Sequence, residues 1–309
     1  MKFSLHSVSY GGAWKGQHVL SLKDFICKAA DLGYDGVEIM AKRPHASPLD
    51  LKEEDCKQLR KLAESKGMEI ECLAGYHDFS HDSIHPDMAH NEKELVYLEA
   101  ELNLAVWLGA PLLRVYGGSI YSDASWDEQW KWVIESLKEG AKLAEKYGVI
   151  LGLQNHNEIG HYHEDVLDII REVGSKNLKV CLDAPYIAMT GAPLDKAVHQ
   201  VGNLIVHSTC SDHKIRPLIR WPQLASSHNH SVGFYKVNRW NSVPIGDGEI
   251  DYKTFVRALV EIGYKGFLGY EMCGPIPGGG AEENLDKAAK KSLDYMRNLV
   301  AEIEKEVKK

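Results

Sequence analysis

Side chains that can transfer protons or bind metal ions end most of the short apolar runs in this sequence. Carboxylates stand in or directly after three of these runs, at Glu38, Asp183 and Glu271. A carboxylate beside a buried apolar run is costly unless it is paired, so each needs a cation or a proton. Comparable positions hold an amide, imidazoles and a guanidinium, namely Gln154, His156, His207, His77 and Arg114. This pattern indicates a site for proton transfer or metal binding.

Eight apolar runs are expected to hold these groups as strands, at 3–8, 36–40, 69–74, 112–116, 150–155, 179–183, 204–209 and 267–271. Amphipathic stretches lie between and after them, near 21–33, 50–66, 87–108, 125–147, 163–173, 193–201, 251–263 and 281–306. Gly33 and Gly148 each follow a helical stretch, where a left-handed residue closes the helix. Alternating apolar strands and helices predict a single α/β domain over 1–309, a parallel (β/α)8 TIM barrel.

In such a barrel the reacting groups project from the carboxyl ends of the strands. The residues expected to bind substrate there are Lys42, Arg43, His45, His77 and Arg114. Residues 210–250 lie between the last two strands, and a connection of this length is expected to be an active-site loop. Both features place the chemistry at one mouth of the barrel.

Composition excludes several classes of function. The chain has 309 residues with 36 Lys and Arg against 44 Asp and Glu, a net charge of −8, which argues against a nucleic-acid binder. No run approaches the roughly 18 apolar residues of a membrane span. The first residues do not resemble a signal peptide, and the six cysteines form no CxxC pair. A cytoplasmic protein is therefore expected.

Five phrases together resemble the xylose-isomerase-like barrels, a family that includes sugar phosphate isomerases and epimerases. They lie at 32–38, 153–156, 181–183, 243–252 and 269–271. The resemblance implies one divalent ion, most often Mn²⁺, with Co²⁺, Fe²⁺, Mg²⁺ and Zn²⁺ as alternatives. It also implies enolisation, in which a base removes the proton next to a sugar ketone. The ligands implied are Gln154, Asp183, His207 and Glu271.

The sequence departs from the family pattern at this site. Gln154 stands where the family has a glutamate, and Thr209 falls where it has a ligand histidine. A further family histidine is replaced by Tyr186. Whether His207 or Thr209 would meet the ion is left open. Without a carboxylate at 154, the two opposed carboxylates of an epimerase are lost, and His156 is the expected base because it faces the same side of its strand.

One-base proton removal suits elimination, and a subgroup resemblance agrees. Met40-Ala41-Lys42-Arg43-Pro44-His45, Gln154-Asn155-His156 and Tyr270-Glu271-Met272-Cys273 resemble the large catalytic subunit of bacterial C-glycoside deglycosidases. This implies a metal-dependent lyase that cleaves 3-oxo-glycosides, with a small β-rich partner subunit. One alternative is a sugar or sugar-phosphate isomerase or epimerase with Glu271 as base. A second is a non-catalytic barrel that binds a sugar or scaffolds a partner, and a homo-oligomer also remains open.

Overall fold

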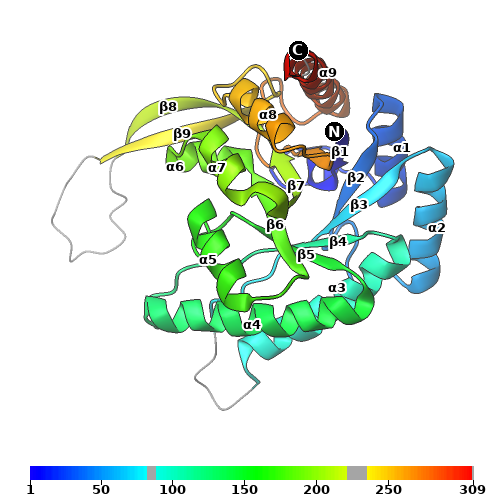
Figure 1. Ribbon diagram of the computed structural model, residues 1–309. Coiled ribbons are helices and arrows are strands. Elements are labelled where there is room, and N and C mark those ends of the chain that lie inside the picture. Colours follow the sequence, from blue (N-terminus) through cyan, green and yellow to red (C-terminus); the bar gives the residue numbers. More distant parts are fainter. Residues whose placement is uncertain (82–87, 221–234, 308–309) are drawn as a thin grey trace.

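Eight parallel strands close into a barrel in the computed structural model, which describes residues 1–81, 88–220 and 235–307. Around the barrel the strands follow the order β1-β10-β7-β6-β5-β4-β3-β2 (Figure 1). Their bounds are β1 Lys2–His6, β2 Gly36–Met40, β3 Glu69–Ala74, β4 Leu112–Val115, β5 Ile150–Gln154, β6 Leu178–Asp183, β7 Ile205–Cys210 and β10 Phe267–Tyr270. The predicted (β/α)8 barrel is thus confirmed.

Helices surround the strands and cover their outer faces (Figure 1). Their bounds are α1 Leu22–Leu32, α2 Glu53–Ser65, α3 His90–Leu108, α4 Trp126–Tyr147, α5 His163–Val173, α6 Ala184–Thr190, α7 Leu194–Val201, α8 Tyr252–Glu261 and α9 Glu282–Val307. Two short 3₁₀ helices, η1 Ser7–Tyr10 and η2 Gly202–Leu204, complete the set. Within the described residues, no helix is both long and apolar enough to cross a membrane.

Local sequence explains where the helices begin and end. Ser125 accepts a hydrogen bond from the Glu128 N–H, and the Glu128 side chain accepts one from the Ser125 N–H, which forms a capping box at α4. Gly148 then ends α4 with a φ of 66°, a conformation that favours glycine. Asp183 caps the unexpected helix α6 in the same way as Ser125 caps α4, by accepting from the Tyr186 N–H.

The segment between β7 and β10 differs from the loop expected over 210–250. Its described parts form an antiparallel hairpin of β8 Asp212–Arg220 and β9 Tyr235–Val243, which extends away from the barrel (Figure 1). Residues 221–234 lie outside the described part of the chain. Alternating polar and apolar residues such as Lys214-Ile215-Arg216 are typical of a strand and mark this hairpin in the sequence. The segment is therefore an arm of two paired strands over its described length.

Asp212 ties the base of this hairpin to the barrel. Its buried carboxylate accepts hydrogen bonds from the backbone N–H groups of His213, Gly246, Gly248 and Ile250, at 2.8–3.2 Å. These residues, apart from His213, belong to the phrase over 243–252 that carried part of the family resemblance. The phrase therefore has a structural reason, since its glycines bring backbone donors to one carboxylate.

Replacing Asp212 should destabilise the fold strongly. Asp212→Ala leaves four backbone donors without their acceptor, and we expect the free energy of unfolding to fall by about 3 kcal/mol or more. Chemical denaturation followed by circular dichroism measures this change. Asp247→Ala is the matched control, because Asp247 makes an exposed ion pair with Lys291, and its loss should cost less than about 1 kcal/mol. Equal effects of the two changes would contradict the role of Asp212.

Candidate active site

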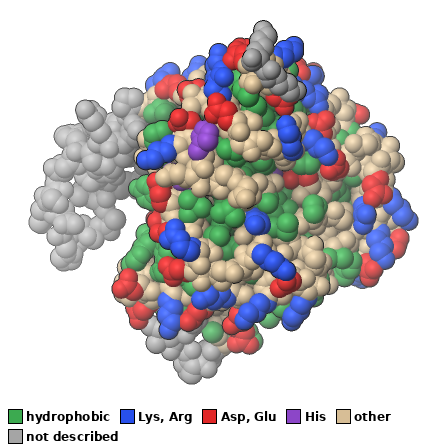
Figure 2. Space-filling view, in the orientation of Figure 1, with side chains coloured by type: hydrophobic (Ala, Val, Ile, Leu, Met, Phe, Trp, Pro, Cys, Tyr) green, Lys and Arg blue, Asp and Glu red, His purple; other side chains and the backbone are tan. Residues whose placement is uncertain are grey.

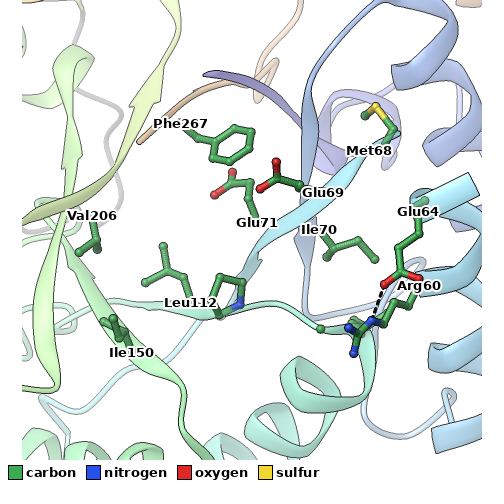
Figure 3. Close-up of a pocket in the computed structure, with 14 residues that line it drawn as sticks. Arg60, Glu64, Met68, Glu69, Ile70, Glu71, Leu112, Ile150, Val206 and Phe267 are labelled. Atoms are coloured by element: carbon green, nitrogen blue, oxygen red, sulfur yellow. Dashed lines mark hydrogen bonds and ion pairs between the residues drawn. The ribbon is translucent and has the colours of Figure 1, made fainter. Parts of the chain in front are cut away.

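The barrel has a pocket at each mouth. The pocket at the amino ends of the strands has a volume of about 440 Å³, and apolar side chains such as Ile70, Leu112 and Phe267 line much of it (Figure 3). The carboxylates at its rim are paired, since Glu64 accepts from Arg60 and Glu69 accepts from Lys2. Figure 2 shows hydrophobic side chains gathered in the middle of one face, with charged side chains nearer its edge. Strand starts of this kind serve stability in TIM barrels.

The pocket at the carboxyl ends of the strands is instead lined by many titratable side chains. Its volume is about 410 Å³. Five of the residues predicted from the sequence line it together, namely Lys42, His77, Arg114, His156 and Glu271, and Tyr76, Tyr116 and Cys273 complete its reactive wall. Reacting groups in TIM barrels lie at this face, so this pocket is the candidate active site.

Two residues expected to bind substrate make other contacts. The exposed Arg43 donates two hydrogen bonds to Asp50, at 2.6 and 2.7 Å. The buried His45 has its Nε2 3.1 Å from the Leu20 carbonyl oxygen, and its ring stacks on Phe25. Neither residue is among those that line the candidate active site. Both follow β2 in sequence, but the chain turns away from the mouth after Lys42.

The residues at the family's ligand positions meet at the ends of β5, β6 and β7. Gln154 Nε2 donates to Asp183 Oδ2 at 2.6 Å and lies 3.4 Å from Thr209 Oγ1. The strand register pairs Asp183 with Thr209. Burial and the charge of Glu271 raise the pKa of Asp183 well above its usual value, and burial raises the pKa of Glu271 to about 7. Two carboxyl groups therefore share this end of the barrel.

These four positions do not fit a divalent ion as they stand. Gln154 directs its amide N–H at Asp183, and its own oxygen has no hydrogen-bond partner among the described residues. It therefore offers an ion one neutral oxygen, where the family's glutamate would offer a charged carboxylate. Thr209 supplies a hydroxyl in place of an imidazole, which is a weaker ligand for Mn²⁺ or Zn²⁺. The other Asp183 oxygen accepts from the Tyr186 N–H at 3.0 Å. No step of the chemistry below depends on an ion at this place.

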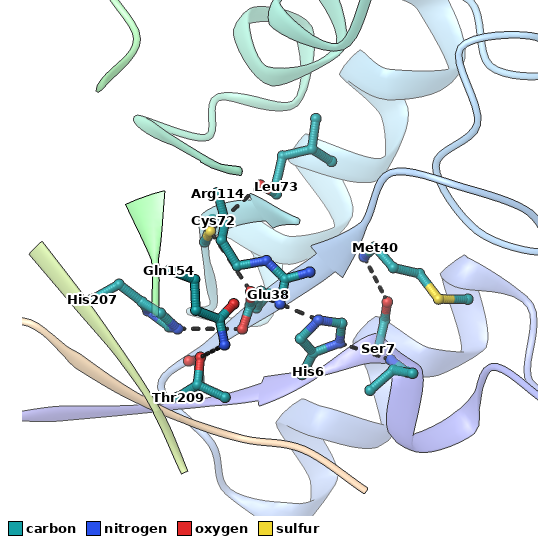
Figure 4. A network of polar contacts seen from close by, with 12 residues as sticks. His6, Ser7, Glu38, Met40, Cys72, Leu73, Arg114, Gln154, His207 and Thr209 are labelled. Carbon is teal, nitrogen blue, oxygen red and sulfur yellow. Dashed lines mark hydrogen bonds and ion pairs between the residues drawn. The ribbon is translucent and has the colours of Figure 1, made fainter. Parts of the chain in front are cut away.

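His207 lies in a different part of the barrel from the one expected. The register pairs His207 with Cys181, which comes two residues before Asp183 in β6. His207 therefore lies roughly 6–7 Å nearer the amino ends of the strands than Asp183 does. Its Nε2 is 3.3 Å from Glu38 Oε2, and its Nδ1 is 3.2 Å from Glu71 Oε2. His207 therefore contacts two buried carboxylates inside the barrel. Figure 4 shows the contact with Glu38.

The cluster of Glu38, Glu71 and His207 could hold a metal ion by the closeness of its ligand atoms. Its charges also balance without one. Arg114 Nη1 lies 3.7 Å from Glu38 Oε1, and each nitrogen of the His207 ring faces a different carboxylate. Two cations then offset two carboxylates. Although burial lowers the pKa of His207, the charges of Glu71 and Glu38 raise it to about 10, so the imidazolium is the stable form.

This raised pKa predicts a stability that falls at alkaline pH. The His207 pKa is about 10 in the folded chain against 6.5 for an ordinary histidine, so its contribution is complete below pH 6.5 and is lost as the pH rises through 10. The slope is up to roughly 1.4 kcal/mol per pH unit. We expect His207→Gln to remove this part of the dependence, measured by urea unfolding at pH 6.5, 8 and 9.5. An unchanged slope in the variant would contradict the charged imidazolium.

His156 lies at the pocket wall between two tyrosine rings. Its ring stacks on Tyr116 with centroids 4.5 Å apart and lies 4.2 Å from the ring of Tyr186. Its Nδ1 is 2.6 Å from the Asn157 side-chain oxygen. Burial and the nearby Arg114 lower the pKa of His156 to about 4. The imidazole is therefore neutral at pH 7 and a weaker base than the sequence led us to expect.

His77 is held by a carboxylate that the sequence did not reveal as functional. Its Nε2 lies 3.1 Å from Glu101 Oε2, and both side chains are buried. Burial lowers the pKa of His77, but the charge of Glu101 outweighs it and leaves the pKa raised. Glu101 shares its helix face with Leu98 and Ala105 by their spacing of three and four residues. A carboxylate on this apolar helix face is a signal in the sequence that could have identified Glu101 as a buried partner of a cation. Glu71, which lies within the apolar strand β3, could have been identified in the same way.

The fold and the pocket together define a class of protein: a TIM barrel with titratable side chains at its carboxyl mouth. The chain belongs to the xylose isomerase-like TIM barrel family, whose model matches residues 26–299. It is 25% identical to the D-psicose 3-epimerase of Ruminiclostridium cellulolyticum, with 96% of this chain and 97% of the relative covered. It is 24% identical to the fructoselysine 3-epimerase of Escherichia coli O157:H7, with 83% and 87% covered.

Solved structures agree on the fold. The structure of L-ribulose 3-epimerase superposes with a TM-score of 0.74 at 18% identity and covers 99% of this chain and 97% of that chain. The family expected from the sequence is thus confirmed. The narrower resemblance to C-glycoside deglycosidases gains no support from these relatives, and it stays a prediction together with its β-rich partner subunit.

Proposed function

We propose that this protein is a sugar isomerase or epimerase that removes the proton next to a ketone. The observation that carries the proposal is the position of Glu271, whose carboxylate lines the pocket together with Lys42 and Arg114. A base and two cations in one pocket are the groups that enolisation requires, because negative charge moves from the carboxylate to the carbonyl oxygen. The relatives named as sugar 3-epimerases support this choice.

Glu271 suits the role of base because of its surroundings. It directly follows β10, its backbone N–H donates to the Cys210 carbonyl oxygen at 3.1 Å, and its side chain is partly buried. A pKa of about 7 lets the carboxylate accept a proton and return it near neutral pH. In this proposal His77, His156 and the two tyrosines of the pocket bind hydroxyl groups of the substrate.

The expected lyase on 3-oxo-glycosides would share the first step and differ in the second. After the proton leaves, an isomerase or epimerase returns it, whereas a lyase expels the group at the anomeric carbon. The sequence favours elimination because the Gln154 amide cannot act as a second base. In the structure this amide donates a hydrogen bond to Asp183. The relatives favour the isomerase or epimerase.

Hydrogen exchange tests the proposal across a panel of candidate substrates. The protein is incubated in D₂O with single ketoses, such as fructose, psicose, tagatose and ribulose, and with a 3-oxo-glucoside. Proton NMR should show loss of the α-hydrogen signal, and mass spectrometry should show a product of unchanged mass apart from deuterium. Release of a separate aglycone would instead identify the lyase. No exchange with any of these compounds would contradict the proposed function.

A further inference from the structure

We propose that Lys42 and Arg114 stabilise the enolate oxygen in this barrel, in place of a divalent ion at the strand ends. The proposal rests on the proposed function and names the electrophile of the same site. It follows from two separate sets of contacts. The first set occupies the positions that would bind the ion, and the second brings positive charge to the pocket wall.

The first set of contacts engages both carboxylate oxygens of Asp183 at the strand ends. Asp183 Oδ2 accepts from Gln154 Nε2 at 2.6 Å, and Asp183 Oδ1 accepts from the Tyr186 N–H at the start of α6. Asn155 holds the Asp183 backbone on both sides, donating to its carbonyl oxygen and accepting from its N–H. Turning the Gln154 amide over would bring its oxygen against the Asp183 carboxylate and lose the strongest of these contacts. An ion would have to break this arrangement to gain two oxygens.

The second set of contacts holds two cations around one aromatic ring. Lys42 Nζ lies 3.5 Å from the centre of the Tyr76 ring, and Arg114 Cζ lies 5.1 Å from the same centre. Tyr116 lies against Arg114 as well, at 4.7 Å. Aromatic faces attract cations without neutralising their charge, as a carboxylate would. The rings therefore hold both cations at the wall of the pocket, where Lys42 keeps its charge and Arg114 shares its charge with Glu38 inside the barrel.

Both cations have donors available for a ligand. No carboxylate of the described residues lies within ion-pair distance of Lys42. Arg114 is buried, its Nη2 donates to the Gly75 carbonyl oxygen at 3.4 Å, and its Nε has no hydrogen-bond partner among the described residues. Glu38 is the carboxylate beside Arg114, and it is shared with His207. A carbonyl oxygen in the pocket would meet donors that are already in place.

The chemistry balances with these groups alone. Glu271 takes the α-hydrogen of the ketone as a proton, and the electron pair of that C–H bond forms the enolate. The Lys42 ammonium and the Arg114 guanidinium stabilise the negative oxygen, which in the partly dry pocket is worth more than in water. The protonated Glu271 then delivers the proton to the former carbonyl carbon, while the hydroxyl proton on the neighbouring oxygen moves to the former carbonyl oxygen. This completes isomerisation without an oxidant, a reductant or an ion. Return of the proton to the original carbon gives hydrogen exchange alone, because Gln154 cannot act as a second base.

Metal binding provides a test that does not depend on a substrate. The protein is stripped with a chelating resin and titrated with Mn²⁺, and bound ion is read by electron paramagnetic resonance. We expect no ion bound at the strand ends of the natural chain. The double change Gln154→Glu and Thr209→His restores two family ligands and should raise the affinity for Mn²⁺ by more than roughly 100-fold. Mn²⁺ bound by the natural chain and lost in Asp183→Asn would overturn the proposal.

An ion inside the barrel is recognised by a second variant. Mn²⁺ that is lost in His207→Gln but kept in Asp183→Asn would lie at the Glu38, Glu71 and His207 cluster, and the strand ends would still be free of metal, as proposed. The two variants therefore separate the two places where this chain could bind an ion.

Exchange of the α-hydrogen tests the cations themselves. Exchange should continue in excess chelator, and Lys42→Met should slow it roughly 100-fold or more while Lys42→Arg restores part of the rate. Lys57→Met is the matched control, because Lys57 lies on the exposed face of α2 in an ion pair with Glu53. Exchange that requires added Mn²⁺ would overturn the inference. Exchange absent under every condition would contradict the proposed function, while the Mn²⁺ titration would still decide the metal question.

Discussion

Glu271→Gln should abolish the exchange of the substrate's α-hydrogen almost completely. The amide keeps the size of the carboxylate and its place after β10, but it cannot accept the proton. General-base catalysis contributes about 10²–10⁴-fold, so we expect a fall of roughly 1,000-fold. The measurement is the rate of deuterium incorporation by NMR, with circular dichroism to show that the fold is intact. Because the carboxylate is only partly buried, its replacement should leave the barrel folded.

His156→Ala is the comparison that assigns the base. His156 was the base expected from the sequence, and its lowered pKa together with its stacking between Tyr116 and Tyr186 favour a binding role. We therefore expect this change to weaken substrate binding more than the rate of exchange at saturation. The reverse outcome, in which His156→Ala stops exchange and Glu271→Gln leaves it intact, would move the base to His156.

Glu38→Gln should have the largest effect on stability. Glu38 is fully buried and faces His6, Arg114 and His207, at 3.3–3.7 Å (Figure 4). These neighbours hold the pKa of Glu38 below its usual value in spite of burial, so the carboxylate is charged. Removing it leaves two cations short of a partner inside the barrel, and breaking such a buried pair costs roughly 3–5 kcal/mol.

Denaturant unfolding measures this loss in the free energy of unfolding. A double variant and a surface control then show whether the loss comes from the buried charge pair. The double change Glu38→Gln and His207→Gln removes a cation together with the anion, so it should cost less than the sum of the two single changes. Glu69→Gln is the surface control, because its pair with Lys2 is exposed and should be worth less than about 1 kcal/mol. Additive single changes would show that Glu38 and His207 do not act on each other.

The network also links stability to the site. Arg114 lines the pocket and is buried, and it contacts Glu38 inside the barrel. The Glu38 carboxylate therefore holds the guanidinium at the wall where the proposed electrophile is needed. A change at Glu38 that leaves the barrel folded should lower both stability and exchange, although Glu38 is not among the residues that line the pocket.

The fold was largely predictable from residue order because local signals agreed with one another. The period of apolar residues, the glycines Gly33 and Gly148 after helical stretches, and eight strand–helix repeats all indicate a barrel. The hairpin of β8 and β9 was not predicted, since its length suggested a loop and its alternation of polar and apolar residues is a weaker signal. Helix α6 was not predicted for a similar reason, because only its cap at Asp183 and seven residues mark it.

The sequence by itself indicated five of the residues that line the mouth of the barrel. A side chain at a strand end is placed there by the fold alone, and Lys42, His77, Arg114, His156 and Glu271 were all found in this way. Only the tertiary structure decided which of them act together, because contacts between strands depend on register. The register pairs Thr209 with Asp183, so His207, two residues earlier, lies beside Glu38 and Glu71 instead. The contact between the Gln154 amide and Asp183 likewise forms only because their two strands are neighbours.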